Sequence, residues 1–244
     1  MTDFVVLAAQ RTGSNLLCTL LNSHPEILCH HEIFNPRGPR YAVTHRDGSF
    51  DLGSLEERER DPVAFLNRVW RTRCGHPCVG FKMTRGQDER VLRHLLDDPS
   101  IKKIVLQRRN RIKTYVSQQI AQHLDEWEVY HSRELEPDRP RIEVDVTRLR
   151  EHIASNERFY REIGEPLQTR PDSYIKVEYE GLLSQTLHRQ LLDFLGVEPR
   201  GVGLKPSSVK QNSANLRELV SNFAELEEAL RGTDLEEELH ARDN

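Results

Sequence analysis

The sequence has few of the features that mark secreted, membrane-spanning or nucleic-acid-binding proteins. Only 4 of its 244 residues are cysteine, and Cys74 and Cys78 have no second pair at a zinc-binding spacing. The longest apolar runs, such as residues 4–9, fall far short of the ~20 residues that a transmembrane helix needs. The 35 basic and 39 acidic residues leave a net charge of −4, so no overall positive field would hold a nucleic acid. We therefore expect reduced thiols, no membrane span and no nucleic-acid partner, with any anion bound locally.

The amino terminus also lacks a targeting signal. Met1 is followed at once by a strand-like run, without the basic stretch, apolar stretch and small-residue cleavage site of a secretory signal. A cytoplasmic location is therefore the default expectation. At about 150 residues per domain the length allows one or two domains, and we interpret residues 1–244 as a single domain.

Strand-like runs and helical patterns alternate along the chain. Four strand-like runs are each followed by a segment with apolar residues at helical spacing. The predicted strands cover residues 4–9, 78–83, 101–106 and 174–177, and the predicted helices cover residues 14–23, 89–96, 111–123 and 182–195. Strands that alternate with helices indicate an α/β fold with a central parallel sheet flanked by helices.

Two segments between these units are rich in proline, glycine and charge. Residues 35–60 and 125–141 are predicted to be mobile loops over the ligand edge of the sheet, where an acceptor would be recognised. Residues 214–239 instead carry leucines at helical spacing, with glutamate-rich opposite faces. We interpret this segment as a solvated amphipathic helix packed on the sheet.

The junction after the first predicted strand has the chemistry of a phosphate-binding loop. Its residues are Gln10, Arg11, Thr12, Gly13, Ser14 and Asn15. The first N–H groups of the following helix lack backbone partners and lie at the positive end of the helix dipole. Gly13 allows close backbone approach, Thr12 and Ser14 add hydroxyl donors, and Arg11 supplies positive charge. The loop lacks the Gly-Lys-Ser/Thr ending of nucleotide-triphosphate loops. Taken alone, it is also compatible with an ordinary strand-to-helix turn that has an exposed arginine.

A second junction, after the strand at residues 101–106, concentrates cations. Arg108, Arg109 and Arg111 lie there, and Ser117 follows two turns into the next helix. Ligands of open α/β sheets bind at the carboxyl ends of the strands, so two anion sites along this edge suggest one ligand with two separated phosphates. Taken alone, this basic cluster is also typical of a solvated face.

Together, the two junctions resemble those of the sulfotransferases that use 3′-phosphoadenosine 5′-phosphosulfate (PAPS). In that family the loop after the first strand, here residues 10–15, binds the 5′-phosphosulfate. An arginine and a later serine, here Arg109 and Ser117, bind the 3′-phosphate. The resemblance implies a P-loop-like fold, PAPS as the donor, 3′,5′-adenosine bisphosphate (PAP) as the product, and no metal.

Further matches extend the resemblance to about residue 230 of the chain. Residues 177–182, which include Tyr179, resemble the family's Tyr-Glu-Asp-Leu segment, although Gly181 stands where aspartate is commoner. Lys210 and Gln211 resemble a late basic element near the nucleotide. The resemblance therefore implies that Tyr179 and Lys210 belong to the donor site.

One branch of the family resembles the chain most closely, the soluble bacterial carbohydrate sulfotransferases of the nodulation-factor type and, more distantly, the trehalose type. The segments that carry this similarity are residues 11–15, 23–26 and 30–36. In the trehalose type a glutamate shortly after the first helix is the proposed base, and Glu32 matches its place. Such a carboxylate accepts the proton of an attacking hydroxyl. His31 is the alternative base, and a surface or structural role for Glu32 is the third possibility.

The residues around Glu32 do not form a metal motif, because an HExxH site would need histidine where the chain has Asn35. Lys82, on the predicted strand at residues 78–83, resembles a lysine that precedes the catalytic region in several branches. A cation there would neutralise the charge that grows on the bridging oxygen as the sulfuryl group departs. The alternative for Lys82 is a lysine at the exposed end of a strand.

The function predicted from these residues is transfer of a sulfuryl group from PAPS to a hydroxyl of a carbohydrate or glycolipid. The predicted catalytic residues are Glu32 or His31 together with Lys82. A P-loop-like nucleotide kinase or hydrolase is the alternative enzyme class, and a non-catalytic nucleotide-binding module is the alternative outside enzymes.

Overall fold

The core of the protein is a sheet of five parallel strands, in a computed structural model that describes residues 1–46, 50–135, 138–199 and 203–241. The strands are β1 (Thr2–Ala8), β2 (Ile27–His30), β3 (Cys78–Thr84), β4 (Lys102–Gln107) and β5 (Tyr174–Glu178). Their order in the sheet is β2-β3-β1-β4-β5. The predicted parallel α/β fold is therefore confirmed, and β2 is an additional strand that the sequence pattern did not predict.

Ten α-helices are found in the described part of the chain. They are α1 (Ser14–Asn22), α2 (Leu55–Arg60), α3 (Pro62–Arg71), α4 (Glu89–Asp97), α5 (Arg111–Leu124), α6 (Val146–Gln168), α7 (Gln185–Leu195), α8 (Leu216–Leu219), α9 (Phe223–Leu230) and α10 (Glu236–His240). Helix α7 begins at Gln185 and not at residue 182 as predicted, with Ser184 as its N-cap. Within the described residues, no helix combines the length and apolar character that crossing a membrane requires.

Helices cover both faces of the sheet because its central strand is apolar on both sides. Val5 and Leu7 of β1 share one core with side chains of α3, α4 and α6. Phe4 and Val6, which point to the other face, share a second core with side chains of α1 and α7. Continuous apolar runs of this kind are typical of strands buried on both faces.

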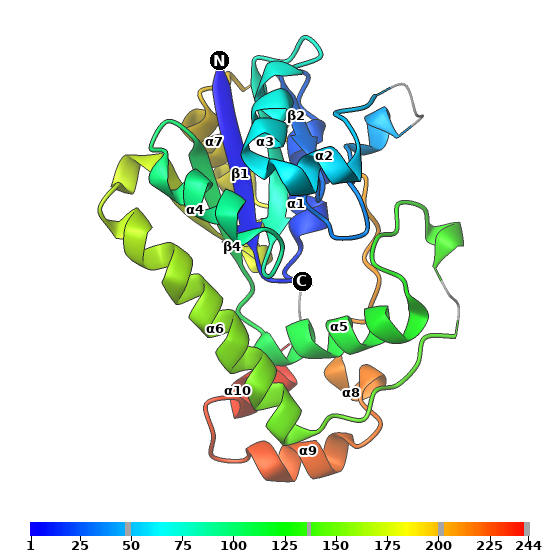
Figure 1. Ribbon diagram of the computed structural model, residues 1–244. Helices are drawn as coiled ribbons and strands as arrows, with labels where there is room; N and C mark the ends of the chain where they lie inside the picture. The colour runs from blue at the N-terminus through cyan, green and yellow to red at the C-terminus, as the bar shows by residue number, and fades with distance from the viewer. Residues whose placement is uncertain (47–49, 136–137, 200–202, 242–244) are drawn as a thin grey trace.

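The carboxyl ends of the strands form the edge on which the candidate site is built. The chain moves from β1 to β2 and β3 on one side and then crosses to β4 on the other, so β1 lies at the point where the strand order reverses. Ligands of such sheets bind beside that point. Helix α5 lies across this end of the sheet, beneath β1 and β4 in the view of Figure 1.

The carboxyl-terminal segment differs from the prediction. Residues 214–239 do not form one helix, because the chain leaves the helical conformation at Val220, which pairs with Ile142, and at Gly232, which has φ 70°. The resulting helices α8, α9 and α10 pack against α5 and the start of α6, and not on the sheet. Figure 1 shows these three short helices together below α5.

The two predicted loops also contain more regular structure than expected. Residues 35–60 include the 3₁₀ turn Val43–His45 and helix α2, so their last part is helical and not a loop. Residues 125–141 include a 3₁₀ turn at Ser132–Glu134. Residues 47–49 and 136–137 of these segments lie outside the described part of the chain.

Candidate functional site

The loop between β1 and α1 has a strained conformation that glycine makes possible. Gly13 precedes α1 with φ 91°, and Arg11 also has a positive φ of 63°. A Cβ atom at Gly13 would lie 2.3 Å from Cδ2 of Tyr179, which packs against the loop. Glycine is therefore required at this position both for its backbone conformation and for the close approach of the tyrosine.

Arg11 connects the loop to the neighbouring segments through all of its guanidinium nitrogens. Its Nε donates to Ser117 Oγ at 3.0 Å, Nη1 donates to the Trp127 carbonyl at 2.9 Å, and Nη2 donates to Gln211 Oε1. Burial, followed by the charge of the nearby Arg108, lowers the pKa of Arg11 to about 10, so the side chain remains a cation at neutral pH. Arg11 thus links the loop to three other segments of the chain, which contain Ser117, Trp127 and Gln211.

A cleft of about 910 Å³ opens beside this loop at the carboxyl edge of the sheet. Most of the site residues predicted from the sequence line it, namely Arg11, Gly13, Ser14, Asn15, Glu32, Lys82, Ser117, Tyr179 and Lys210. Both predicted loops contribute walls, through Asn35, Pro36, Arg37 and Arg40 on one side and Asp125, Glu126, Trp127, Glu128 and Val129 on the other. The two loops therefore border the ligand edge, as the sequence predicts.

Glu32 and Lys82 form a buried ion pair at this cleft. The Lys82 side chain is only 3 % exposed, and its Nζ lies 3.0 Å from Glu32 Oε1. Glu32 Oε2 also accepts hydrogen bonds from Asn35 at 2.8 Å and from Gln87 at 3.0 Å. Burial alone would raise the pKa of Glu32, but Lys82 and Asn35 lower it below its ordinary value. Glu32 is therefore a fixed, ionised carboxylate beside a fixed ammonium group.

Glu128 is a second carboxylate at this ion pair, and the sequence analysis did not identify it. Its Oε1 lies 3.7 Å from Lys82 Nζ and 3.1 Å from His31 Nδ1. Its Oε2 accepts from Arg46 at 2.9 Å and from Tyr130 at 3.0 Å. Nothing in the local sequence distinguishes Glu128 from its acidic neighbours, because its position depends on how the chain returns to the cleft after α5.

His31 is fully buried behind Glu128 and does not line the cleft. An ionised carboxylate can only accept, so the hydrogen bond to Glu128 places the proton of His31 on Nδ1. Burial lowers the pKa of His31, against the raising effect of Glu128, and the ring is neutral at pH 7. Of the two bases considered from the sequence, Glu32 faces the cleft and His31 does not.

The second junction has a different geometry from the first. Arg109 is 69 % exposed, and its Nε pairs with Glu178 at 3.2 Å and with Glu180 at 3.6 Å. Ser117 lines the cleft and accepts a hydrogen bond from Arg11. The structure therefore brings Ser117 together with Arg11 and does not bring it together with Arg109.

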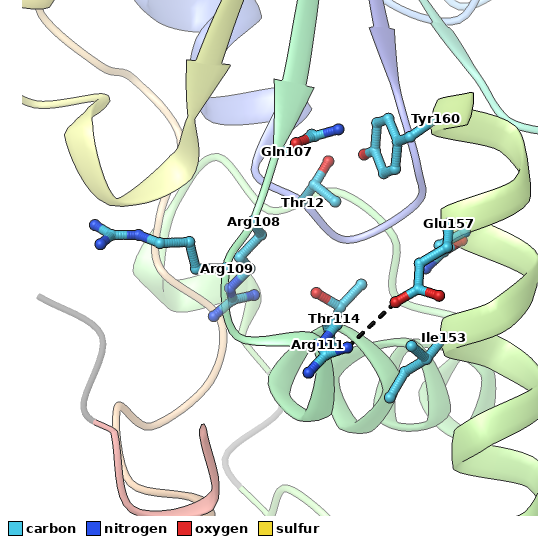
Figure 2. Close-up of a pocket in the computed structure, with 10 residues that line it drawn as sticks. Thr12, Gln107, Arg108, Arg109, Arg111, Thr114, Ile153, Glu157 and Tyr160 are labelled. Atoms are coloured by element: carbon cyan, nitrogen blue, oxygen red, sulfur yellow. Dashed lines mark hydrogen bonds and ion pairs between the residues drawn. The ribbon is translucent and has the colours of Figure 1, made fainter. Parts of the chain in front are cut away.

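Thr12 and Arg109 line a separate cavity of about 250 Å³ between the loop, β4 and α6. The buried Thr12 hydroxyl donates to the Ala9 carbonyl at 2.8 Å. Figure 2 shows Tyr160 above this cavity, an ion pair between Arg111 and Glu157 at its side, and the guanidinium of Arg109 pointing away from it. Neither predicted side chain faces the large cleft.

Comparison with solved structures identifies the architecture. The fold matches the crystal structure of a sulfotransferase from Alicyclobacillus acidocaldarius with a TM-score of 0.50 and 21 % sequence identity, and the match covers 98 % of both chains. The chain has the sulfotransferase fold. This confirms the fold predicted from the two junctions and their order.

Two relatives extend the similarity to the sequence of nearly the whole chain. Both are named Nodulation protein H. The protein from Rhizobium tropici is 23 % identical over 231 residues, which cover 94 % of this chain and 89 % of the relative. The protein from Rhizobium meliloti (strain 1021) is 27 % identical over 229 residues, which cover 91 % and 89 %. No protein-family model matches the chain. The sulfotransferase fold and the similarity to the two Nodulation protein H sequences agree with the resemblance to nodulation-factor sulfotransferases that the motifs show.

Within this sulfotransferase fold, the cleft has the charge and size to hold an anionic nucleotide. Its cationic lining residues are Arg11, Arg37, Arg40, Lys82, Arg108, Lys113 and Lys210. Arg108 donates to the Arg11 carbonyl at 3.2 Å and lies over the Tyr179 ring at 4.5 Å, which ties the second junction to the first. In the described residues, no group of three or more His, Cys, Asp or Glu side chains has the arrangement of a metal site.

Proposed function

We propose that this sulfotransferase-family protein transfers the sulfuryl group of PAPS to a hydroxyl group of a carbohydrate or glycolipid acceptor. The observation that carries the proposal is the Glu32–Lys82 pair, whose 3.0 Å contact lies in the same cleft as the phosphate-binding loop. A base and a cation beside an anion-binding loop are the parts that transfer of an activated anionic group requires.

Residues 11–15 are proposed to hold the 5′-phosphosulfate. The first N–H groups of α1 lie at the positive end of a helix dipole, and Asn15 fixes Lys82 through its Oδ1. Arg11 contributes its positive charge from behind the loop and positions Ser117 and the Trp127 backbone. Thr12 supports the loop through the Ala9 carbonyl.

Arg109 and Ser117 are proposed to hold the 3′-phosphate, as the family resemblance implies. Arg109 must then leave Glu178 and Glu180. Arg109 and Glu178 are both mostly exposed, and an ion pair of this kind contributes only about 0–1 kcal/mol, while the contact with Glu180 is longer, at 3.6 Å. Rotation of the Arg109 side chain toward the 3′-phosphate therefore requires little free energy. Tyr179 and Lys210 line the same cleft and are proposed to contact the nucleotide.

Glu32 is proposed to accept the proton of the attacking hydroxyl. The donor supplies an already activated sulfuryl group, and the acceptor oxygen forms the new bond to sulfur while the bridging oxygen takes the electron pair of the broken bond. Lys82 donates to that bridging oxygen and neutralises its growing charge. Trp127 and the polar side chains of Asn35, Arg37 and Asp125 form the outer wall of the cleft, where we propose that the acceptor lies.

Incubation with ³⁵S-labelled PAPS and a panel of oligosaccharides and glycolipids, followed by mass spectrometry, tests the proposal. We expect label in a glycan product and PAP in equal amount. Adenosine 5′-phosphosulfate, which lacks the 3′-phosphate, serves as the matched donor and should be used poorly. Hydrolysis of ATP that a chelator abolishes and magnesium restores would instead support the nucleotide kinase or hydrolase.

A further inference from the structure

We infer that Glu128 is a positioning residue. It holds Lys82 in place at the reacting centre while Glu32 takes up the proton of the acceptor hydroxyl. The inference rests on the proposed function and assigns different roles to the two carboxylates that flank Lys82, with Glu32 as the proton acceptor and Glu128 as the group that positions the lysine. Both carboxylates are paired with the buried ammonium group of Lys82.

Lys82 is surrounded by acceptors from three separate parts of the chain. Its Nζ donates to Asn15 Oδ1 on α1, lies 3.0 Å from Glu32 Oε1 and lies 3.7 Å from Glu128 Oε1. An ammonium group has three N–H donors. Asn15 and Glu32 lie within hydrogen-bonding distance of Nζ, whereas Glu128 at 3.7 Å acts through its charge, so the third donor can be directed at a ligand. Burial alone would lower the pKa of Lys82, but Glu32 and then Glu128 raise it above its ordinary value. Lys82 is therefore held as a cation by two counter-charges.

The two carboxylates differ in the partners that occupy them. Among the described residues, the partners of the Glu32 carboxylate other than Lys82 are the neutral amides of Asn35 and Gln87, both of which donate to Oε2. Glu128 has donors on both oxygens, with His31 on Oε1 and the cation Arg46 together with Tyr130 on Oε2. Glu32 is thus the carboxylate that can more easily take up a proton.

The acid strengths of the two groups support the same division. Burial alone would raise the pKa of Glu128, but the hydrogen bond from His31 and the charges of Lys82 and Arg46 lower it far below its ordinary value. The pKa of Glu32 is lowered less strongly. A carboxylate with a very low pKa is a weak base and keeps its charge throughout a proton transfer.

This difference has a consequence during the reaction. When Glu32 accepts the hydroxyl proton, it becomes neutral and Lys82 loses one of its two counter-charges. Glu128 stays ionised, so Lys82 remains a cation at the moment when the bridging oxygen gains the electron pair of the breaking S–O bond. Without Glu128, both the charge and the position of the ammonium would depend on the carboxylate that is being neutralised.

The donor loop also fixes the segment that carries Glu128. Helix α5 ends at Leu124, the following Asp125 has φ 48°, and the chain then turns back along the cleft. The carbonyl of Trp127 accepts from Arg11 Nη1 at 2.9 Å and from Asn15 Nδ2 at 3.3 Å. A displacement of residues 11–15 is therefore transmitted directly to the neighbour of Glu128.

The test compares Glu128→Gln with wild type and with Glu89→Gln, a matched change at an exposed position of α4. In the protein without ligands, ¹⁵N NMR of the lysine side chains follows the titration of Lys82. We expect the titration to move to lower pH in Glu128→Gln and to stay unchanged in Glu89→Gln. With PAPS and a glycan acceptor, kcat of Glu128→Gln should fall about 10- to 100-fold, as misplaced reacting groups typically cause, with little change in PAP affinity.

Glu128→Asp separates a loss of charge from a loss of structure. This variant keeps the charge, so the titration of Lys82 should stay close to that of wild type and part of the lost kcat should return. A folded Glu128→Gln protein with wild-type kcat and an unmoved Lys82 titration would overturn the inference, and so would an Asp variant no better than the Gln variant. If wild type transfers no label from PAPS, the proposed function fails, and the Lys82 titration still decides whether Glu128 controls the lysine.

Discussion

Two cations, each flanked by two carboxylates, stand on opposite sides of β1 at the carboxyl edge of the sheet. On β3, Lys82 is 3 % exposed and lies between Glu32 and Glu128. After β4, Arg109 is 69 % exposed and lies between Glu178 and Glu180. The two groups have the same formal charge, but one is enclosed by the fold and the other is screened by water.

The difference in burial explains why the two groups suit different tasks. Buried charges interact strongly and keep one geometry, as a group that takes part in chemistry must. Exposed charges contribute little stability and exchange partners readily, as a side chain that must take hold of an incoming phosphate must. The comparison therefore assigns chemistry to the group around Lys82 and ligand capture to the group around Arg109.

The largest expected difference between the two groups is in stability. Lys82→Met leaves Glu32 and Glu128 without their shared cation, so it should lower the free energy of unfolding by about 3–5 kcal/mol. Arg109→Met removes a pair in which Arg109 and Glu178 are both mostly exposed, together with a longer 3.6 Å contact to the less exposed Glu180, and should change it by about 1 kcal/mol or less. Urea unfolding at pH 7 measures both values. Equal losses of unfolding free energy in Lys82→Met and Arg109→Met would show that the buried and the exposed charge groups do not differ in their contribution to stability.

The next effect concerns the arginine that ties the donor loop to its surroundings. Arg11→Ala removes the donors to Ser117, Trp127 and Gln211, so the loop loses its fixed position. We expect kcat/KM for PAPS to fall about 100-fold in steady-state assays at saturating acceptor. Arg93→Ala, an exposed change on α4, is the control. An unchanged kcat/KM in a folded Arg11→Ala variant would exclude residues 11–15 from the phosphosulfate site.

A smaller effect is expected when the exposed arginine is removed. A hydrogen bond to a charged group contributes about 1.5–3 kcal/mol, so Arg109→Ala should weaken PAP binding about 10- to 100-fold. The affinity for adenosine 5′-monophosphate, which has no 3′-phosphate, should not change. Calorimetry with both nucleotides measures this preference. A variant that still prefers PAP as strongly as wild type would show that Arg109 remains with Glu178 and Glu180 when the nucleotide binds.

The smallest effect on PAP affinity is expected when a carboxylate beside Arg109 loses its charge. Glu178→Gln removes a charge that competes with the 3′-phosphate for Arg109. Because an exposed pair contributes about 0.2–1 kcal/mol, PAP should bind more tightly by no more than about fivefold. Weaker binding of PAP would mean that Glu178 helps to orient Arg109 and does not compete for it.

The sequence predicts those parts of the fold that depend on local pattern. Strands β1, β3 and β4 contain largely apolar, buried runs, and their burial on both faces explains why the pattern is visible. Strand β5 was also predicted, although Val177 is its one buried residue. Strand β2 has only four residues and was missed. The long helix α6 was also missed, because its five buried residues are spread over 23 positions and charged residues separate them. The carboxyl-terminal helices were misjudged because Val220 and Gly232 interrupt a leucine pattern that continues past them.

The site is predictable where it lies on strand-to-helix junctions and less so elsewhere. Residues 11–15 and Lys82 follow from strand ends, which the parallel sheet brings to one edge. The orientation of a side chain at such an edge does not follow from spacing, so the sequence could not show that Arg109 turns away from Ser117. Glu128 reaches Lys82 only through the turn of the chain after α5, and contacts of that kind leave no sequence signature.

The Glu32→Gln variant tests the proposed proton transfer most directly. Its turnover is measured at saturating PAPS and acceptor, together with calorimetry of PAP binding. Gln is nearly isosteric with Glu and cannot accept the proton, so kcat should fall by about 10²–10⁴ while PAP affinity stays at the wild-type value. That result would establish the Glu32–Lys82 pair as the reacting centre of the cleft. A folded Glu32→Gln enzyme that keeps most of its turnover would contradict the role of Glu32 as the base.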